Sequence, residues 1–317
     1  SLLQSGKFME KNDIPSTHIF ESAPKFINAY RILSLLGKGG MGAVYKVEKN
    51  PGEIYALKIL LDKEMLDEEN FQRFQREIDI LSSIKHPNIV KIYTGGVWNS
   101  KPYFLMDYLE GTNLADYIKT KKKVLQKEAL QIFYQIACAL VELHAAGIIH
   151  RDIKPENIML CEKKIYLMDF GIALQYEKQE SRLTATGVSV GTLNYMPPEQ
   201  AQGLKKQIGP WCDIYSLGAT LHHTLTGVVP FFGTTKFETV LKMAQEELPS
   251  IRKYNPAFSK ELDGVIQKAT KKNYKDRYSS MQELAEDLHS IILQKKPARK
   301  RAIQKRNTLI PYLALFL

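Results

Sequence analysis

Cysteine is scarce in this 317-residue chain, which contains only Cys138, Cys161 and Cys212. The three lie far apart in the sequence, and their spacing is not that of a zinc site or of a disulfide framework. We therefore expect them to be small buried residues of a protein from a reducing compartment.

A secretory signal is also lacking, because charged residues soon interrupt the apolar start of the chain. The first residue is not Met, which is consistent with a fragment of a longer protein. The apolar run at residues 309–317 has nine residues, whereas a membrane-spanning helix needs about 20. Two interpretations stay open for this run: the first half of a transmembrane helix, or a segment that docks on the folded domain.

Acidic residues are absent from residues 295–306, seven of which are Lys or Arg. Much of the net charge of +10 therefore lies in this tail, and the rest of the chain is only mildly basic. Basic residues without interleaved aromatics or a known module are weak support for nucleic-acid binding, so we expect no specific nucleic acid partner. A basic run beside an apolar segment instead predicts contact with an anionic membrane.

The composition that remains is that of a globular protein, with 44% hydrophobic and 25% charged residues. A chain of this length suggests two folding units of roughly 100 to 200 residues. Residues 1–29 show no sustained hydrophobic period and are expected to form an extension. We expect the folded domain at residues 30–293, followed by a basic, juxtamembrane-like tail at 294–317.

Two short motifs carry the chemistry. Residues 150–157 read His-Arg-Asp-Ile-Lys-Pro-Glu-Asn, and residues 169–171 read Asp-Phe-Gly. A single Asp in a loop is more often a turn or cap residue, but two such motifs at this spacing make that interpretation improbable. Together they resemble the catalytic and metal-binding loops of protein kinases. Lys154, two residues after Asp152, makes the resemblance one to serine/threonine kinases of the eukaryotic-like, bacterial type.

The resemblance covers about Tyr30 to Leu293 and implies an α+β fold, the bilobal protein kinase fold. The N-lobe (30–108) is expected to be an antiparallel β-sheet with one helix, and the C-lobe (112–293) to be mainly helical. Phosphoryl transfer then needs an acid that orients the acceptor hydroxyl, which the resemblance assigns to Asp152, and metal ligands, which it assigns to Asn157 and Asp169.

Residues 37–45 fit the pattern G-x-G-x-x-G-x-V. The glycines alone are a weak signal, because dinucleotide folds share them, but strand-like residues follow here in place of a helix. Lys58 supports the functional interpretation, because a lysine within an apolar strand is costly without a partner for its charge. The resemblance implies that Lys58 binds the ATP phosphates and that Glu77, on a helix predicted at 67–83, holds it.

The same resemblance implies an ATP site between the lobes, with residues 103–111 as the hinge and Met106 as the gatekeeper. The hinge backbone at Asp107 and Leu109 is expected to face adenine, with Met159 beneath it. For residues 103–111 the alternative is an apolar edge strand that ends in glycine. The expected ATP-binding residues are Leu36, Gly37, Lys38, Gly39, Gly40, Met41, Gly42, Val44, Ala56, Lys58, Met106, Asp107, Leu109 and Met159.

Residues 169–199 are rich in Thr, Ser and Gly and lack strong periodicity, which predicts a mobile regulatory loop. Thr184 and Thr186 lie in the region where related bacterial kinases phosphorylate themselves, and Arg151 could hold such a phosphate. Residues 191–199 resemble the segment that binds the residue after the target hydroxyl, and Thr192 within them is expected to give structural support. Pro198 departs there from the family pattern, which leaves the local loop shape open.

Three further residues are implied to support the site. Asp213 is expected to hold the catalytic loop, with a helix N-cap as the alternative role. Glu199 and Arg277 are expected to pair with each other.

We therefore predict a protein serine/threonine kinase, an ATP-dependent phosphotransferase that also phosphorylates its own loop, in trans on a second copy of the chain. The catalytic residues would be Asp152, Lys154, Asn157, Lys58 and Glu77, with ATP and Mg²⁺, or Mn²⁺ in its place, as cofactors. We expect protein substrates with Ser or Thr, and a cytoplasmic kinase domain tethered to the inner face of the membrane. The alternative is a pseudokinase or nucleotide-binding signalling scaffold, which normally lacks a motif residue. Here six motif residues are all present: Lys58, Glu77, Asp152, Lys154, Asn157 and Asp169.

Overall fold

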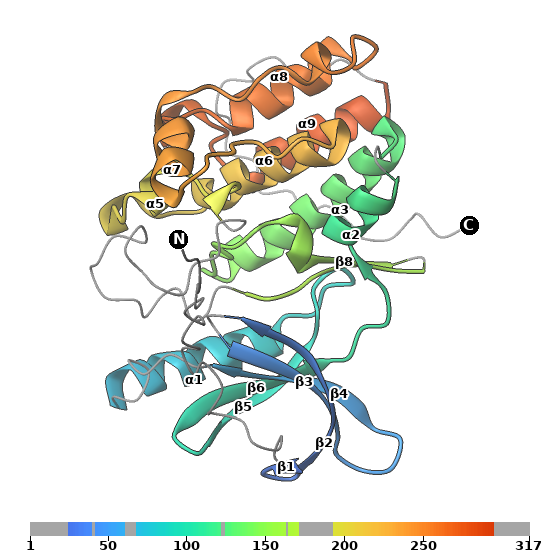
Figure 1. The fold of residues 1–317 in the computed structure, drawn as a ribbon, viewed down its shortest axis with the longest axis vertical. Coiled ribbons are helices and arrows are strands. Elements are labelled where there is room, and N and C mark those ends of the chain that lie inside the picture. Colours follow the sequence, from blue (N-terminus) through green and yellow to red (C-terminus); the bar gives the residue numbers. More distant parts are fainter. Residues whose placement is uncertain are drawn as a thin grey trace, which may run out of the picture.

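A computed structural model describes residues 25–39, 42–60, 68–121, 124–162, 164–170 and 193–294. Figure 1 shows a β-rich lobe below a helical lobe, which confirms the predicted bilobal α+β fold. Several predictions lie outside the described residues: those on Gly40, Met41, Gly171, Thr184, Thr186, Thr192, residues 1–24 and the tail from residue 295.

The N-lobe sheet is antiparallel throughout, in the order β1-β2-β3-β4-β6-β5. Its strands are β1 (Phe26–Ile27), β2 (Tyr30–Gly39), β3 (Gly42–Glu48), β4 (Ile54–Leu60), β5 (Ile92–Trp98) and β6 (Lys101–Asp107). Strand β2 extends to Gly39, because Lys38 and Gly39 still pair with Ala43 and Gly42 on β3.

Side chains along β4 alternate between the two faces of this sheet. Leu57 and Ile59 are buried in a cluster on one face, while Ala56 and Leu60 join the main core, which also includes buried side chains of α1 (Glu68–Ser83). Lys58 therefore shares the face of Ala56 and Leu60. Figure 1 shows α1 beside this sheet, where the sequence predicted the single N-lobe helix.

A second, small sheet belongs to the C-lobe and has the strand order β7-β8-β9. Its strands are β7 (Thr112–Asn113), β8 (Ile158–Cys161) and β9 (Lys164–Leu167). Strands β8 and β9 are antiparallel neighbours that form a hairpin. Residues 150–157 directly precede this hairpin in the sequence, and Asp169 follows it closely.

The C-lobe is mainly helical, as predicted. Its helices are α2 (Leu114–Lys121), α3 (Gln126–Ala145), α5 (Pro198–Ala201), α6 (Trp211–Thr226), α7 (Lys236–Gln245), α8 (Lys260–Ala269) and α9 (Met281–Ile292). Its short 3-10 turns are η2 (Pro155–Asn157), η4 (Lys205–Gln207), η5 (Ile251–Lys253) and η6 (Tyr274–Asp276).

Helix α6 is the centre of this lobe, because almost all of its side chains are buried. It packs against α3, α8 and α9 and ends at Gly227, whose positive φ of 70° suits a glycine C-cap. Cys212 of α6 is buried as expected, whereas Cys138 and Cys161 are only half-buried. Within the described ranges, no helix has both the length and the apolar character that crossing a membrane requires.

Candidate active site

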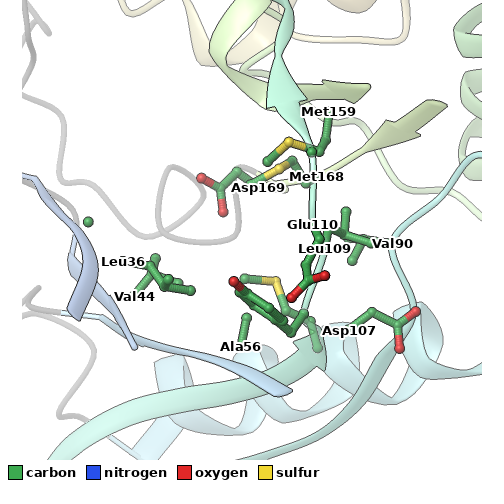
Figure 2. A pocket seen from close by; sticks show the side chains of 14 residues that line it. Leu36, Val44, Ala56, Val90, Asp107, Leu109, Glu110, Met159, Met168 and Asp169 are labelled. Carbon is green, nitrogen blue, oxygen red and sulfur yellow. The ribbon is translucent and has the colours of Figure 1, made fainter. Parts of the chain in front are cut away.

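A cavity of about 540 Å³ lies between the two lobes (Figure 2). Eight of the predicted ATP-binding residues line it: Leu36, Gly37, Val44, Ala56, Met106, Asp107, Leu109 and Met159. The remaining lining residues are Val90, Tyr108, Glu110, Gly111, Met168 and Asp169. Figure 2 shows Leu36 and Val44 on one side of the space and Met159, Met168 and Asp169 on another. Apolar walls with a few carboxylates are typical of a small-ligand site.

Sequence reasoning missed Val90 and Met168 as lining residues. Val90 ends the run His-Pro-Asn-Ile-Val at 86–90, and Met168 directly precedes the predicted metal ligand Asp169. For Met168 the available signal was its place beside Asp169, whereas no predicted site residue adjoins Val90. Lys38, Gly39, Gly42 and Lys58 are described but do not line this cavity.

The glycines at the adjoining ends of β2 and β3 differ in what requires a residue without a side chain. A Cβ added to Gly42 would lie 2.1 Å from the carbonyl oxygen of Ile59, so packing against β4 requires glycine at that position. A Cβ added to Gly37 or Gly39 would meet no described atom within 4 Å. Neither neighbouring atoms nor a positive φ explains these two glycines, whereas a ligand that approaches the backbone closely would.

The predicted hinge segment, residues 103–111, begins within β6, where Met106 is buried and pairs with Ala56 of β4. The N–H of Asp107 donates to the carbonyl oxygen of Lys91 at 3.0 Å, and the Asp107 carboxylate accepts from the Tyr93 hydroxyl at 2.7 Å. The amide hydrogen of Asp107 is therefore already used within the protein. An adenine contact from this residue would fall on its carbonyl oxygen.

Lys58 is bonded to Asp169, with 2.9 Å between Nζ and Oδ1. Burial alone would raise the pKa of Asp169, but the nearby Lys58 ammonium holds it below its usual range. Glu77 lies on α1 and is buried, with 8% of its surface exposed. Its predicted pairing with Lys58 stays a prediction.

Asp152 is held by two neighbours in the catalytic loop. The ammonium group of Lys154 lies 2.8 Å from its Oδ2, and the amide group of Asn157 donates to Oδ2 at 3.0 Å and to the backbone oxygen at 2.7 Å. The three predicted side chains thus form one hydrogen-bonded group. The N–H of Met168 donates to the carbonyl oxygen of Asn157 at 3.0 Å, which places the loop beside the segment that carries Asp169.

Asp213 of α6 is fully buried beneath this loop. It accepts hydrogen bonds from the backbone N–H groups of His150 and Arg151, each at 2.8 Å, and lies 2.8 Å from Nε2 of His144. Burial alone would raise the pKa of Asp213, but the contact with His144 and these bonds hold it below its usual range. Helix α6 begins at Trp211 and its N-cap is Pro210, so the alternative role of Asp213 as an N-cap is wrong.

His150 fills the space between the two loops. It is fully buried, and burial lowers its pKa. The N–H of Asp152 donates to Nδ1 at 3.3 Å, so the ring hydrogen lies on Nε2 and donates to the Met168 carbonyl at 3.1 Å. The neutral imidazole thereby couples the two motifs.

The backbone is strained in both motifs that His150 connects. Arg151 has a φ of 64°, and Asp169 has a φ of 58°. Left-handed non-glycine residues cost roughly 1–3 kcal/mol and persist only when their surroundings fix them. Both positions neighbour or carry predicted functional carboxylates.

Glu199 and Arg277 form a buried, bidentate pair. Nη1 and Nη2 of Arg277 donate to the two carboxylate oxygens of Glu199 at 2.6 and 2.8 Å. The structure thus brings together the two side chains that the sequence analysis expected to pair.

Comparisons with known proteins agree with this geometry. A family model described as the protein kinase domain matches residues 30–289. The chain is 36% identical over 266 residues to the probable serine/threonine-protein kinase PknB of Lactococcus lactis, covering 83% of this chain and 42% of that protein. It is 38% identical over 265 residues to the serine/threonine-protein kinase PrkC of Bacillus subtilis, covering 82% and 40%.

The crystal structure of the Mycobacterium tuberculosis PknI kinase domain is similar to this fold, with a TM-score of 0.65 and 27% identity. That similarity covers 84% of this chain and 96% of the PknI domain chain. The chain spans less than half the length of the two curated relatives.

Proposed function

Since this chain belongs to the protein kinase family, we propose that it is a serine/threonine kinase that transfers the γ-phosphoryl group of ATP to hydroxyl groups of proteins. The similarity to bacterial serine/threonine kinases supports this proposal. The observation that carries it is the hydrogen-bonded group of Asp152, Lys154 and Asn157, which lies against the segment holding Asp169 on the cavity wall.

The residues present fit a nucleotide with a divalent metal ion. The family implies ATP and a divalent metal, and we propose Mg²⁺. Both amide hydrogens of Asn157 are directed at Asp152, which leaves the amide oxygen as a candidate ligand together with the Asp169 carboxylate. No described cluster of three or more His, Cys, Asp or Glu residues could hold a metal, and Mg²⁺ is usually held by one or two protein oxygens with phosphate and water. Bound there, the ion would neutralise charge on the phosphates.

The protein's own residues would then act by positioning and by charge. Asp152 orients the acceptor hydroxyl and takes its proton, while Lys154 offsets the negative charge of the group in transfer. Lys58, supported by Glu77, orients the phosphates. The adenine would lie between Ala56 and Met159 in the apolar part of the cavity.

A transfer assay tests the proposed function. The purified chain is incubated with radiolabelled ATP, Mg²⁺ and a general protein substrate, in parallel with Asp152→Asn. We expect incorporation into Ser and Thr by the parent and loss of about 10²–10⁴-fold in the variant, because the carboxylate acts on the acceptor. Turnover of the variant within a few-fold of the parent would refute the role of Asp152. A parent without transfer would refute the kinase activity.

We also propose that the chain phosphorylates itself in trans at Thr184 or Thr186. Nε of Arg151 is buried without a hydrogen-bond partner among the described residues, so this cation could hold a phosphate of about −1.5 to −2 charge. Mass mapping after incubation with ATP should locate phosphate at these threonines. Phosphate found only outside residues 169–199, or full activity of the double Thr→Ala variant, would contradict this proposal.

The last proposal concerns residues 295–317, which we infer to tether the kinase to an anionic membrane on its cytoplasmic side. Their basic run would contribute roughly 1 kcal/mol per Lys or Arg near the surface. The 317-residue chain should therefore sediment with anionic vesicles, and a chain that ends at Leu293 should not, while both phosphorylate protein equally. Equal partitioning of the two chains would remove the tail from any membrane role.

A further inference from the structure

Gln200 contacts the catalytic loop at a point that none of the motif residues reaches. Its side-chain amide donates to the carbonyl oxygen of Arg151 at 2.7 Å, and only 3% of its surface is exposed. Gln200 lies on the single turn of α5. The contact joins residues 49 positions apart in the sequence.

This hydrogen bond fixes the peptide plane that directly precedes the catalytic carboxylate. That plane contains the carbonyl oxygen of Arg151 and the amide nitrogen of Asp152. The oxygen accepts from Gln200, and the nitrogen donates to Nδ1 of His150 at 3.3 Å. With one bond at each edge, the plane cannot rotate freely, and its orientation sets the direction in which the Asp152 side chain leaves the backbone.

The restraint is needed because Arg151 has a left-handed backbone, with a φ of 64°. An L-residue held in that conformation relaxes unless its surroundings oppose the change. Asp213 restrains the amide hydrogens of His150 and Arg151 from α6. Gln200 restrains the carbonyl group of Arg151 from a separate element.

Helix α5 is itself a fixed point, because the residue before Gln200 is Glu199, whose carboxylate is held by Arg277. Described residues 193–201 are buried throughout and continue directly from the segment that contains the predicted regulatory threonines. A displacement of α5 would therefore move the donor on which the Arg151 carbonyl depends.

We propose that Gln200 is a positioning residue for phosphoryl transfer, which holds Asp152 in its working orientation through the Arg151 carbonyl. The inference rests on the proposed function. It assigns to Gln200 an effect on the transfer step itself, with none on the binding of ATP or of the acceptor.

The test uses Gln200→Met, which keeps the length of the side chain but removes the donor, and Gln200→Glu, which keeps its shape. The matched control is Gln202→Met, because Gln202 is exposed and directly follows the same turn. We expect kcat to fall about 10- to 100-fold in both Gln200 variants, the effect of a small misplacement of a reacting group. KM for ATP and for a peptide acceptor should stay within about two-fold, and the control should match the parent.

A double-mutant cycle separates positioning from a general loss of structure. If Gln200 acts through Asp152, Gln200→Met should not lower the residual rate of Asp152→Asn any further. Thermal unfolding of each variant establishes that it is folded at the assay temperature.

Three outcomes would overturn the inference. They are a kcat equal to that of the parent in both folded Gln200 variants, an equal proportional loss in the Asp152→Asn background, and a rise in KM that accounts for the whole loss. A parent chain that transfers no phosphoryl group would overturn the proposed function instead, and this role with it.

Discussion

Two ion pairs in this molecule have similar short distances and very different surroundings. Lys58 and Asp169 meet beside the cavity, where their side chains are 13% and 23% exposed. Arg277 and Glu199 meet inside the C-lobe, where the values are 0% and 3%. Arg277 also donates to the carbonyl oxygens of Trp211, Lys271 and Lys272.

The difference shows what each pair can do. The planar guanidinium of Arg277 has its donors committed on all sides, so the pair fixes α5 and can serve no ligand. The ammonium of Lys58 has three donors on a flexible stem and lies next to a cavity, so it can bond to a phosphate while it stays near Asp169. Proximity alone would not have distinguished a structural pair from a functional one.

The largest effect should come from breaking the pair beside the cavity. Asp169→Ala removes a proposed metal ligand and the partner of Lys58, so we expect turnover to fall about 10³-fold. Mg²⁺-dependent nucleotide affinity should fall as well. The free energy of unfolding should fall by less than the loss expected from breaking the interior pair, because the side chains of Lys58 and Asp169 keep partial access to water beside the cavity.

The matched variant for this prediction is Asp152→Asn, which should lose turnover but keep the affinity of the parent for Mg·ATP. Titration of each protein with a fluorescent nucleotide, with and without Mg²⁺, gives the comparison. Equal Mg·ATP affinity in Asp169→Ala and Asp152→Asn would contradict the assignment of Asp169 as a metal ligand.

Much of this site could be predicted from the sequence because its chemistry lies in short contiguous motifs. Asp152, Lys154 and Asn157 occupy one loop, and their spacing alone brings them together. Lys58 could be recognised because a charged side chain in an apolar strand costs free energy unless its charge has a partner. The fold class was implied by the family resemblance that these motifs carry.

The unpredicted contacts are those made by ordinary residues across long sequence distances. His144 lies on α3 and reaches Asp213, 69 residues away, and Gln200 reaches Arg151. Neither residue breaks a local pattern, since a Gln on a short helical turn or a His near a helix end is unremarkable. Tertiary packing decides that their polar groups meet a loop backbone, and no local signal records it.

The second prediction breaks the interior pair. Arg277→Leu leaves the Glu199 carboxylate buried without its partner, so we expect a loss of about 3–5 kcal/mol in the free energy of unfolding. For a domain of this size that corresponds to a fall of roughly 6–20 °C in Tm. Differential scanning calorimetry measures it, and nucleotide affinity well below Tm should stay near that of the parent.

The double variant Glu199→Gln with Arg277→Met is the control, because it removes both charges together. Replacing a buried pair by uncharged groups is often close to neutral, so the double variant should be more stable than Arg277→Leu. If Arg277→Leu is as stable as the parent, the pair does not anchor α5, and the fixed point assumed for Gln200 is lost.

The smallest effect concerns the pH dependence of the free energy of unfolding. It arises at His222 in the helical C-lobe, which does not line the cavity between the lobes. His222 of α6 donates from Nε2 to the Pro249 carbonyl at 2.9 Å and faces His223, Asp263 and the Tyr254 ring. Burial lowers its pKa from 6.5 to about 4. Between these two pH values the unfolded chain binds a proton that the folded protein does not, so stability falls as pH is lowered through this window.

From pH 7.5 to 5.5 this single group should lower the free energy of unfolding by about 1.4 kcal/mol, or Tm by roughly 3–5 °C. His222→Gln preserves a donor for the Pro249 carbonyl but cannot titrate, so its Tm should fall less than that of the parent between the two pH values. Identical pH dependence of Tm in the two proteins would show that His222 is protonated in the folded state as readily as in the unfolded chain.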